Sequence, residues 1–232
     1  MAPVHQLDGN PNRKEQMSNR GTTLLALLAL ALGLLVAACG EDDDVSGAGS
    51  STPESAPGSG ADRAFAEAMI PHHRSAVEMA EVAKQRSTRK EIKQLADAII
   101  TTQKAEIEQL TAVDQTLKDA GIEPGDLGVS HNEMGMGDDA SMLEDAKPFE
   151  REFIDMMIAH HQGAIRMARA VQQRGQNSEL KDLATAIEDA QAKEIDDMNA
   201  WRVEWYGAIS PAGGVPKEEP ADGDGGHAGH GV

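Results

Sequence analysis

The fold is decided by the stretch MIPHHRSAVEMA at residues 69–80, which returns as MIAHHQGAIRMA at residues 157–168. The repeat extends well beyond these twelve positions. Residues 69–110 align without a gap with residues 157–198, and 18 of the 42 aligned positions are identical. An identity this high over a continuous stretch indicates an internal duplication. We therefore expect two copies of one structural unit, each with a His-His pair on a helix that also carries methionine.

Sequence signals divide the first copy into two helices. The first helix is predicted over 62–86, with Asp62 as its N-cap residue. The second is predicted to start at the capping box Thr88-x-x-Glu91 and to stop at Gly121. The short connection makes this copy, residues 62–121, an antiparallel helical hairpin.

The second copy, residues 148–207, shows the same organisation. Its first helix is predicted from Pro148, a residue suited to the first turn, to Gly175, and its second from Ser178 to Gly207. Each hairpin has an apolar face, and packing the two together would bury both faces. The predicted fold is an all-α, ferritin-like four-helix bundle over residues 61–208.

Polar residues interrupt the apolar face of the second helix in each copy. The face follows the alternating four-three spacing of a bundle core: Ile92, Ala96, Ile99, Gln103, Glu106, Leu110, Val113 and Leu117 in the first copy, and Leu180, Ala184, Ile187, Gln191, Glu194, Met198, Trp201 and Trp205 in the second. Burying a carboxylate without a partner is costly. Glu106 and Glu194 are therefore expected to face hydrogen-bond donors, a cation or water.

The His-bearing helices carry imidazoles and thioethers on one face. At 100° per residue, Met69, His72 and Met79 lie within about 80° of one another, with His73 at the edge. Imidazole and thioether ligands suit a soft, copper-type ion. The predicted ligands are Met69, His72, His73, Met79, Met157, His160, His161 and Met167, while Gln103, Glu106, Gln191 and Glu194 are expected as additional ligands or as groups that hydrogen-bond to ligands. Each copy is expected to form its own site.

Simpler interpretations of these residues stay open. A methionine at helical spacing often only fills a core, and a Gln-x-x-Glu pair can hydrogen-bond a protonated histidine without any metal. The segment between the copies contains His131, Met134 and Met136, separated by small and polar residues. This segment is interpreted as a loop that captures a soft metal, with a flexible acidic connector as the alternative.

The N-terminal part reads as an export signal. Residues 1–38 are expected to be a lipoprotein signal peptide, with translation starting at Met1 or at Met17, because a short apolar run ends in Val-Ala-Ala-Cys39. Cys39 is the single cysteine, so no disulfide can form within the chain, and it is the predicted lipidation site. Residues 39–60 are expected to be a flexible tether and residues 209–232 a disordered acidic, Gly-rich tail. The expected location is the extracytoplasmic side of the cell membrane.

The charge of the chain excludes some partners. The formal net charge is −18, from 21 basic and 39 acidic residues. Removing residues 1–38 takes away three basic and two acidic residues, which leaves −19. Such a surface repels nucleic acid and attracts cations in general. We therefore expect no nucleic-acid partner.

The repeated motifs resemble the DUF305 family of bacterial exported proteins, which includes copper-binding CopM-like members. The resemblance rests on residues 65–80 and 153–168, extends over residues 61–206, and includes the Met-rich segment between the copies. It implies a ferritin-like four-helix fold and extracytoplasmic copper binding. The predicted function is that of a lipid-anchored binding protein, rather than an enzyme, that sequesters or transfers Cu(I) or Ag(I). The alternatives are a di-iron carboxylate oxidase, which would hold iron at Glu106 and Glu194, and a metal-free interaction module of the cell envelope.

Overall fold

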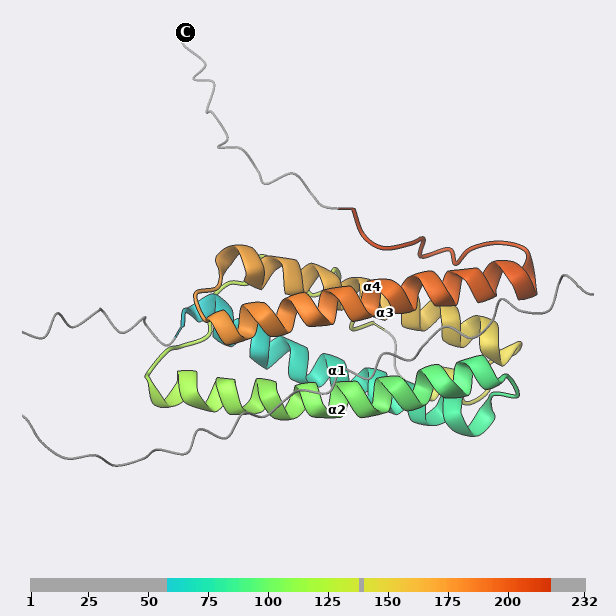
Figure 1. Cartoon of the computed structure of the whole chain (residues 1–232), viewed down its shortest axis with the longest axis horizontal. Helices are drawn as coiled ribbons and strands as arrows, with labels where there is room; N and C mark the ends of the chain where they lie inside the picture. The colour runs from blue at the N-terminus through green and yellow to red at the C-terminus, as the bar shows by residue number, and fades with distance from the viewer. Residues whose placement is uncertain (1–57, 138–139, 218–232) are drawn as a thin grey trace, which may run out of the picture. The chain divides into compact units, whose positions relative to one another are not determined.

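The computed structural model describes residues 58–137 and 140–217, and these contain four long helices, one short 3-10 helix and no strand (Figure 1). The elements are α1 (Gly60–Arg86), α2 (Lys90–Asp119), η2 (Ala140–Leu143), α3 (Phe149–Arg174) and α4 (Ser178–Tyr206). The predicted all-α bundle of two helical hairpins is confirmed.

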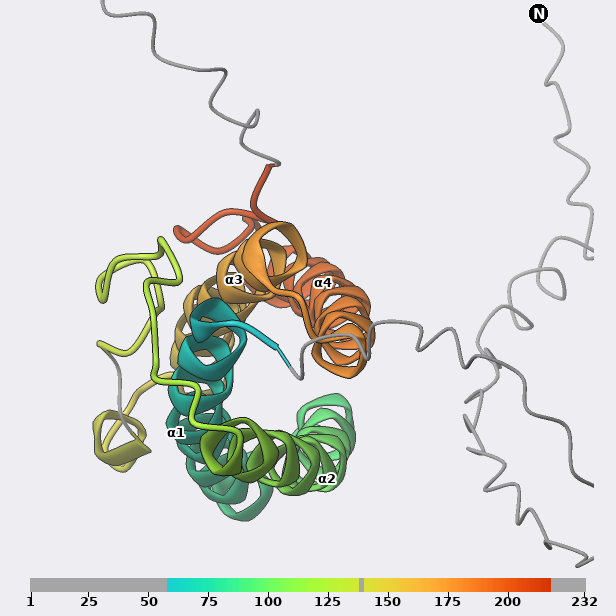
Figure 2. The ribbon, with the colours of Figure 1, turned by 90° about the vertical axis from the view of Figure 1, so that its left-hand side faces the viewer.

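The hairpins meet through their first helices. α1 packs on α2 and α3 packs on α4, whereas contact between the hairpins runs mainly between α1 and α3. Seen end-on, α1 and α3 form the middle of an arc, and α2 and α4 lie at its ends (Figure 2). The two His-bearing helices are therefore placed against each other at the centre of the bundle.

Two predicted helix starts are wrong. Ser59, not Asp62, is the N-cap of α1, and Asp62 is the third residue of a capping box with Ser59. The capping box expected at Thr88 does not form, because α2 begins at Lys90 without a side-chain cap. The backbone N–H of Thr88 instead donates to the Glu150 carboxylate at 3.0 Å. The first difference arises from the local capping box of Ser59 and Asp62, and the second from the tertiary contact with Glu150. For α3 the difference is one residue, since Pro148 is the N-cap and lies just before the helix.

Acidic residues in the first turns of α1 and α3 connect the hairpins to each other. Asp62 on α1 accepts hydrogen bonds from the backbone N–H groups of Gln176 and Asn177, at 2.8 and 3.2 Å, in the α3–α4 connection. Glu150, the equivalent residue on α3, accepts from Ser87 and Thr88 in the α1–α2 connection. Each hairpin thus satisfies loop donors of the other, as a pseudo-twofold relation between the hairpins requires.

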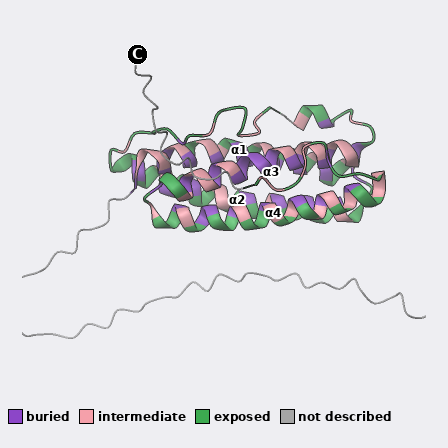
Figure 3. Cartoon of the chain, turned by 90° about the horizontal axis from the view of Figure 1, so that it is seen from above, coloured by how far each residue is buried: buried purple, intermediate pink, exposed green. Residues whose placement is uncertain are grey.

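The core consists of two apolar clusters, one toward each end of the bundle, and the buried residues line the inner sides of the helices (Figure 3). One cluster contains Met79, Phe153 and Met157, and the other contains Phe65, Met69 and Met167. The residues between these clusters along each helix are the polar ones singled out from the sequence.

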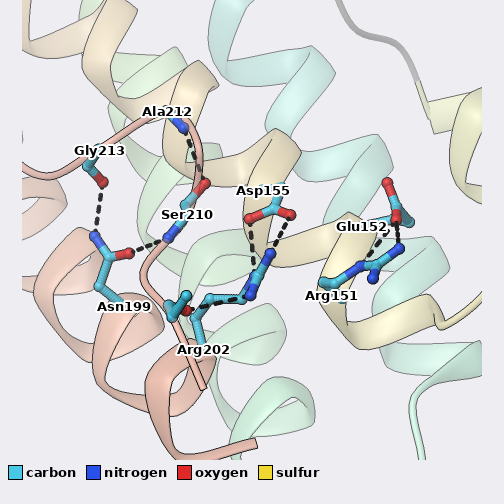
Figure 4. A network of polar contacts seen from close by, with 9 residues as sticks. Arg151, Glu152, Asp155, Asn199, Arg202, Ser210, Ala212 and Gly213 are labelled. Atoms are coloured by element: carbon cyan, nitrogen blue, oxygen red, sulfur yellow. Dashed lines mark hydrogen bonds and ion pairs between the residues drawn. The ribbon is translucent and has the colours of Figure 1, made fainter. Parts of the chain in front are cut away.

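The packed part extends beyond the predicted end of the domain. The segment 208–217 follows α4 and lies against α3 and α4, where Asn199 bonds Ser210 and Gly213 (Figure 4). The Gln162 amide donates to the carbonyls of Ala212 and Gly214 at 2.8 and 2.7 Å. The sequence prediction assigned residues 209–217 to a disordered tail, because the partners of this segment are remote in sequence.

Several predicted features lie outside the described residues. These are the signal peptide, Cys39, most of the tether 39–60 and the tail from residue 218. Within the described part of the chain, no helix has the length and apolar character needed to cross a membrane.

Candidate metal centre

A layer of polar side chains separates the two apolar clusters. We call it the polar belt, and it comprises His72, His73, Gln103, Glu106, His160, His161, Gln191 and Glu194. The four histidines are buried, with exposures of 0 or 1%, and the two glutamines are buried at 2 and 3%. All four helices contribute to the polar belt, as the repeat in the sequence predicts.

The centre of the polar belt is a pair of histidines, one from each hairpin. The rings of His72 on α1 and His160 on α3 have centroids 3.7 Å apart and an interplanar angle of 35°. His73 and His161 lie farther out, with ring centroids 6.3 and 6.4 Å from His72 and His160 respectively. The sequence predicts one site in each copy, and the structure brings the two His pairs into a single centre.

Each outer histidine faces a glutamate of its own hairpin. Nε2 of His161 lies 2.7 Å from Oε2 of Glu194 in a hydrogen bond. Nε2 of His73 lies 2.7 Å from Oε2 of Glu106, but the angle of this contact falls outside hydrogen-bond geometry. The carboxylates on the apolar face of α2 and α4 therefore have the partners that their burial requires.

The inner histidines are held in the neutral form. Burial, together with the like charges of the nearby His73 and His161, lowers the pKa of His72 to about 3. Burial likewise lowers the pKa of His160 well below its usual range, with the other three histidines adding to the effect. Backbone groups of Met134 and His160 near the His72 ring counteract the lowering of its pKa in part, although neither contact meets hydrogen-bond geometry. A neutral imidazole has the free lone pair that a metal ligand needs.

Many polar atoms of the belt have no hydrogen-bond partner. Both ring nitrogens of His72, of His73 and of His160 are buried without a partner in hydrogen-bond geometry, as is Nδ1 of His161. The same holds for Oε1 of Gln103 and of Gln191. Leaving a buried polar group unpaired costs about 1–3 kcal/mol, so a set of this size in one layer is expensive for the fold. A concentration of unpaired polar atoms calls for a physical explanation, such as a bound ion.

Thioethers flank the histidines at both ends of the belt. Met79 and Met157 are buried in one apolar cluster, and Met69 and Met167 are buried in the other. Each cluster therefore holds one belt-flanking methionine from each hairpin. This differs from the expectation that both methionines of one copy serve that copy's own site, because the hairpins pack antiparallel.

The loop between the hairpins lies over α3 next to the histidines. A Cβ at Gly163 would overlap the carbonyl of Met134, and a Cβ at Gly135 would lie 3.3 Å from Cα of His160. Gly135 also has a φ of 69°, which favours glycine. Met134 is half-buried against the apolar cluster of Met69 and Met167. Of the predicted capture loop, Met134 and Met136 are thus half-buried and His131 is exposed.

The sequence analysis missed this close approach of the loop to α3. The signal was the pair Gln162-Gly163, which replaces Arg74-Ser75 of the first copy. Gln162 bonds the segment 208–217, and Gly163 gives the backbone of Met134 room to approach. A glycine inside a helix that is otherwise repeated can therefore indicate a close backbone contact.

The donor set fits a soft metal, although no complete site is preformed. In the described part of the chain, no three side chains among His, Cys, Asp and Glu come together as a metal site would require. The buried neutral imidazoles and the neighbouring thioethers are the ligand types that suit Cu(I). A metal bound here would draw ligands together by small side-chain movements, and the orphaned nitrogens identify which atoms are available.

The fold and the polar belt define a class: four-helix proteins built from two hairpins, with a buried centre of histidines flanked by methionines. The family model of DUF305, described as a domain of unknown function, matches residues 62–202 and again 150–229. The chain belongs to the DUF305 family. A comparison with curated proteins finds no match.

Solved structures agree with this assignment. The chain is 35% identical to CopM in its Cu(II)-bound form, with a TM-score of 0.55, and the match covers 62% of this chain and 97% of that one. For CopM in an Ag-bound form the identity is 35% and the TM-score 0.54, with 63% and 97% covered. A DUF305 protein from Streptomyces coelicolor is 28% identical, with a TM-score of 0.54, and 65% and 96% of the two chains are covered.

Proposed function

We propose that this protein binds Cu(I), and Ag(I) as its chemical analogue, at the centre of the polar belt, and that it sequesters or transfers the metal outside the cytoplasm. The ligands are His72 and His160, with His73 and His161 beside them. The methionines on either side supply thioethers. Sequestration and transfer need no chemical step, so this role is one of binding and not of catalysis.

The observation that carries the proposal is the set of seven imidazole nitrogens that are buried without a hydrogen-bond partner. In a structural core these atoms would destabilise the fold, whereas a metal ion would pair with them. Both central rings are neutral because their pKa values are lowered, so no proton has to leave before the metal binds. The similarity to CopM, solved in Cu(I)-, Cu(II)- and Ag-bound forms, supports the choice of metal.

The carboxylates favour copper over the di-iron alternative. A di-iron centre in a helical bundle takes a glutamate from each helix, two of them in Glu-x-x-His motifs. Here Glu106 and Glu194 each contact a histidine of their own hairpin, and the His-bearing helices have no Glu-x-x-His motif.

The test is a Cu(I) competition titration against a chelator of known affinity, on wild-type protein and on a variant with His72, His73, His160 and His161 all changed to leucine. The variant should stay folded, because leucine fills the space and removes unpartnered nitrogens, and it should lose tight Cu(I) binding. Met79→Leu with Met167→Leu should bind more weakly but stay packed, because leucine and methionine are similar in volume. Unchanged Cu(I) affinity without the histidines, or iron loading that depends on Glu106 and Glu194, would overturn the proposal.

We also propose that the protein is tethered to the membrane by lipid on Cys39. The support is the sequence alone, a short apolar run that ends at this single cysteine. A lipid anchor would keep the bundle at the membrane surface, where it meets incoming metal. Cys39→Ser should move the protein out of the membrane fraction or leave it unprocessed. A processed Cys39→Ser protein that still sediments with membranes would contradict the anchor.

A further inference from the structure

The two glutamates of the polar belt contact the histidines through one particular ring atom. In both hairpins the contact joins Nε2 of the outer histidine to Oε2 of the glutamate, at 2.7 Å. An ionised carboxylate can only accept a hydrogen bond, so the nitrogen that faces it has to carry the proton. In a neutral imidazole the other nitrogen, Nδ1, is then unprotonated and has a free lone pair.

The Nδ1 atoms of the two outer histidines are left unpaired, as this tautomer requires. Nδ1 of His73 and of His161 is buried and has no hydrogen-bond partner. The glutamates, in contrast, are partly open to solvent, with side-chain exposures of 15% for Glu106 and 18% for Glu194. Each Glu–His pair therefore places a carboxylate toward the surface and an unpaired imidazole nitrogen in the interior.

We propose that Glu106 and Glu194 are positioning residues, which hold His73 and His161 as Nε2–H tautomers and so present Nδ1 of each as the ligand atom. This inference rests on the proposed function for the identity of the metal. Carboxylates that orient a metal-binding histidine in this way fix its tautomer and raise its basicity as a ligand, and their loss commonly costs about 10–100-fold in affinity.

The two hairpins differ in how firmly the tautomer is held. The Glu194 contact has hydrogen-bond geometry, whereas the Glu106 contact has the same distance without a favourable angle. Pro71 stands two residues before His73, and Ala159 takes the corresponding place before His161. The stronger effect is therefore expected at His161, which makes Glu194 the residue to change first.

The experiment reads the tautomer directly. Protonated and unprotonated ring nitrogens resonate in separate ¹⁵N ranges, so a long-range ¹H–¹⁵N spectrum of the metal-free, His-labelled full chain assigns each ring. The wild-type protein should show His161 with a proton on Nε2 and none on Nδ1. Glu194→Leu, which has no acceptor, should give a mixture of tautomers, and Glu194→Gln should restore the wild-type pattern through its amide oxygen.

The matched control is Glu188→Leu. Glu188 also lies on α4, has a side-chain exposure of 20%, and pairs with Arg169 on α3 at 2.7 Å, but it contacts no histidine. Both leucine variants remove a 2.7 Å contact between α3 and α4, and Glu188→Leu also removes a hydrogen bond from Gln172 at 3.2 Å, so the control should be destabilised at least as much as Glu194→Leu. Only Glu194→Leu should lower Ag(I) affinity, by about 10–100-fold. An equal loss in Glu188→Leu would reduce the role of Glu194 to helix packing and overturn the proposal.

Ag(I) then identifies the ligand atom, because it is diamagnetic and leaves the spectrum readable. Titration of the wild-type protein should shift Nδ1 of His161 far more than Nε2. An Nδ1–H tautomer or an imidazolium in the metal-free protein would overturn the proposal, as would an Ag(I)-induced shift on Nε2 instead. The proposed function fails separately, if no histidine of the polar belt responds to Ag(I) at all.

Discussion

The two hairpins are alike on the inside of the bundle and different on the outside. On the inner face both contain a His-His pair, a Gln-x-x-Glu pair and two methionines at equivalent positions. On the outer face of α3, Gln162 and Gly163 are buried under other segments, whereas the equivalent Arg74 of α1 is exposed and Ser75 is half-buried. The hairpins have therefore diverged where one is covered and stayed alike where they build a common centre.

Ion pairs show a different kind of divergence. In the first hairpin Arg63 on α1 pairs with Asp114 on α2 at 3.4 Å. In the second hairpin Arg202, which takes the place of Asp114, pairs with Asp155 on α3 at 3.2 Å (Figure 4). Asp155 is the equivalent of Glu67, so the acidic position is kept on the first helix of each hairpin, while the arginine comes from α1 in the first hairpin and from α4 in the second. Each hairpin therefore has an arginine–carboxylate ion pair between its two helices, but a different helix supplies the arginine.

The largest predicted effect concerns the central pair His72 and His160, where the hairpins are equivalent. The pKa of His72 is about 3 and that of His160 is also far below its usual range, while both would be near 6.5 in the unfolded chain. As the pH falls below about 6.5, only the unfolded chain takes up these protons. The free energy of unfolding of the metal-free protein should therefore decrease by roughly 1 kcal/mol per pH unit for each histidine.

Urea unfolding between pH 7 and pH 4 measures this dependence. His72→Leu and His160→Leu should each reduce the slope, and to a similar extent, because the two rings occupy equivalent places. A slope that depends on one histidine only would break the equivalence of the hairpins. A wild-type stability that stays constant from pH 7 to pH 5 would contradict the neutral, buried pair.

The second prediction compares the acids that join the hairpins. Asp62 is fully buried and accepts bonds from Ser59, Gln176 and Asn177, so Asp62→Ala should cost about 2–3 kcal/mol by leaving buried donors unpaired. Glu150 lies nearer the surface, and Glu150→Ala should cost about 1 kcal/mol. Thermal and urea unfolding of the two variants measure the difference. Equal losses of unfolding free energy in the two variants would contradict the larger contribution expected from the more deeply buried Asp62.

The hydrogen bonds of Glu150 also make the stability of the protein depend on pH. Burial alone would raise the pKa of Glu150, but hydrogen bonds from Thr88 and Ser87 outweigh it and lower the pKa. The stabilisation of the fold by the Glu150 carboxylate is therefore present above its unfolded-state pKa of about 4.3. It is lost as the pH falls through the lower pKa of Glu150 in the folded protein. Glu150→Gln should remove this part of the acid sensitivity without affecting the part between pH 5 and pH 6.5.

The last prediction tests the difference between the outer faces of the two hairpins. Gly163→Ala places a methyl group against the carbonyl of Met134 and should destabilise the protein by about 1–2 kcal/mol as the loop is displaced. Ser75→Ala, at the equivalent position of α1, should change stability by less than about 0.5 kcal/mol. Limited proteolysis should show faster cleavage within residues 131–137 in Gly163→Ala. Identical behaviour of the two variants would contradict the close packing of the loop on α3.

The sequence was sufficient to predict the four helices, the hairpin pairing and the polar belt, because the repeat and the heptad-like spacing are local signals. It also placed the His pair and the Gln-x-x-Glu pair of each copy in one site, and the structure brings His73 to Glu106 and His161 to Glu194. Helix periodicity determines which side chains face inward, and this was enough for both inferences.

The sequence could not predict which residues of the two copies meet. Antiparallel packing of α1 on α3 brings His72 to His160 and joins Met79 with Met157 in one cluster, and these are relations between elements that periodicity does not define. The capping errors have the same origin. Thr88 has the sequence of a cap, but Glu150 from the other hairpin binds its backbone. The ordering of residues 209–217 depends on Gln162 and Asn199, which are likewise distant in sequence.

The central claim is that the two hairpins form one shared metal centre, and a double-mutant cycle between His72 and His160 tests it most directly. Cu(I) affinity and stoichiometry are measured by competition titration for wild type, His72→Leu, His160→Leu and the double variant. A shared centre predicts that either single change removes most of the tight binding and that the second change adds little, so the effects are strongly non-additive. Two independent sites would give the opposite result, with each single variant keeping half of the tightly bound copper and the losses adding.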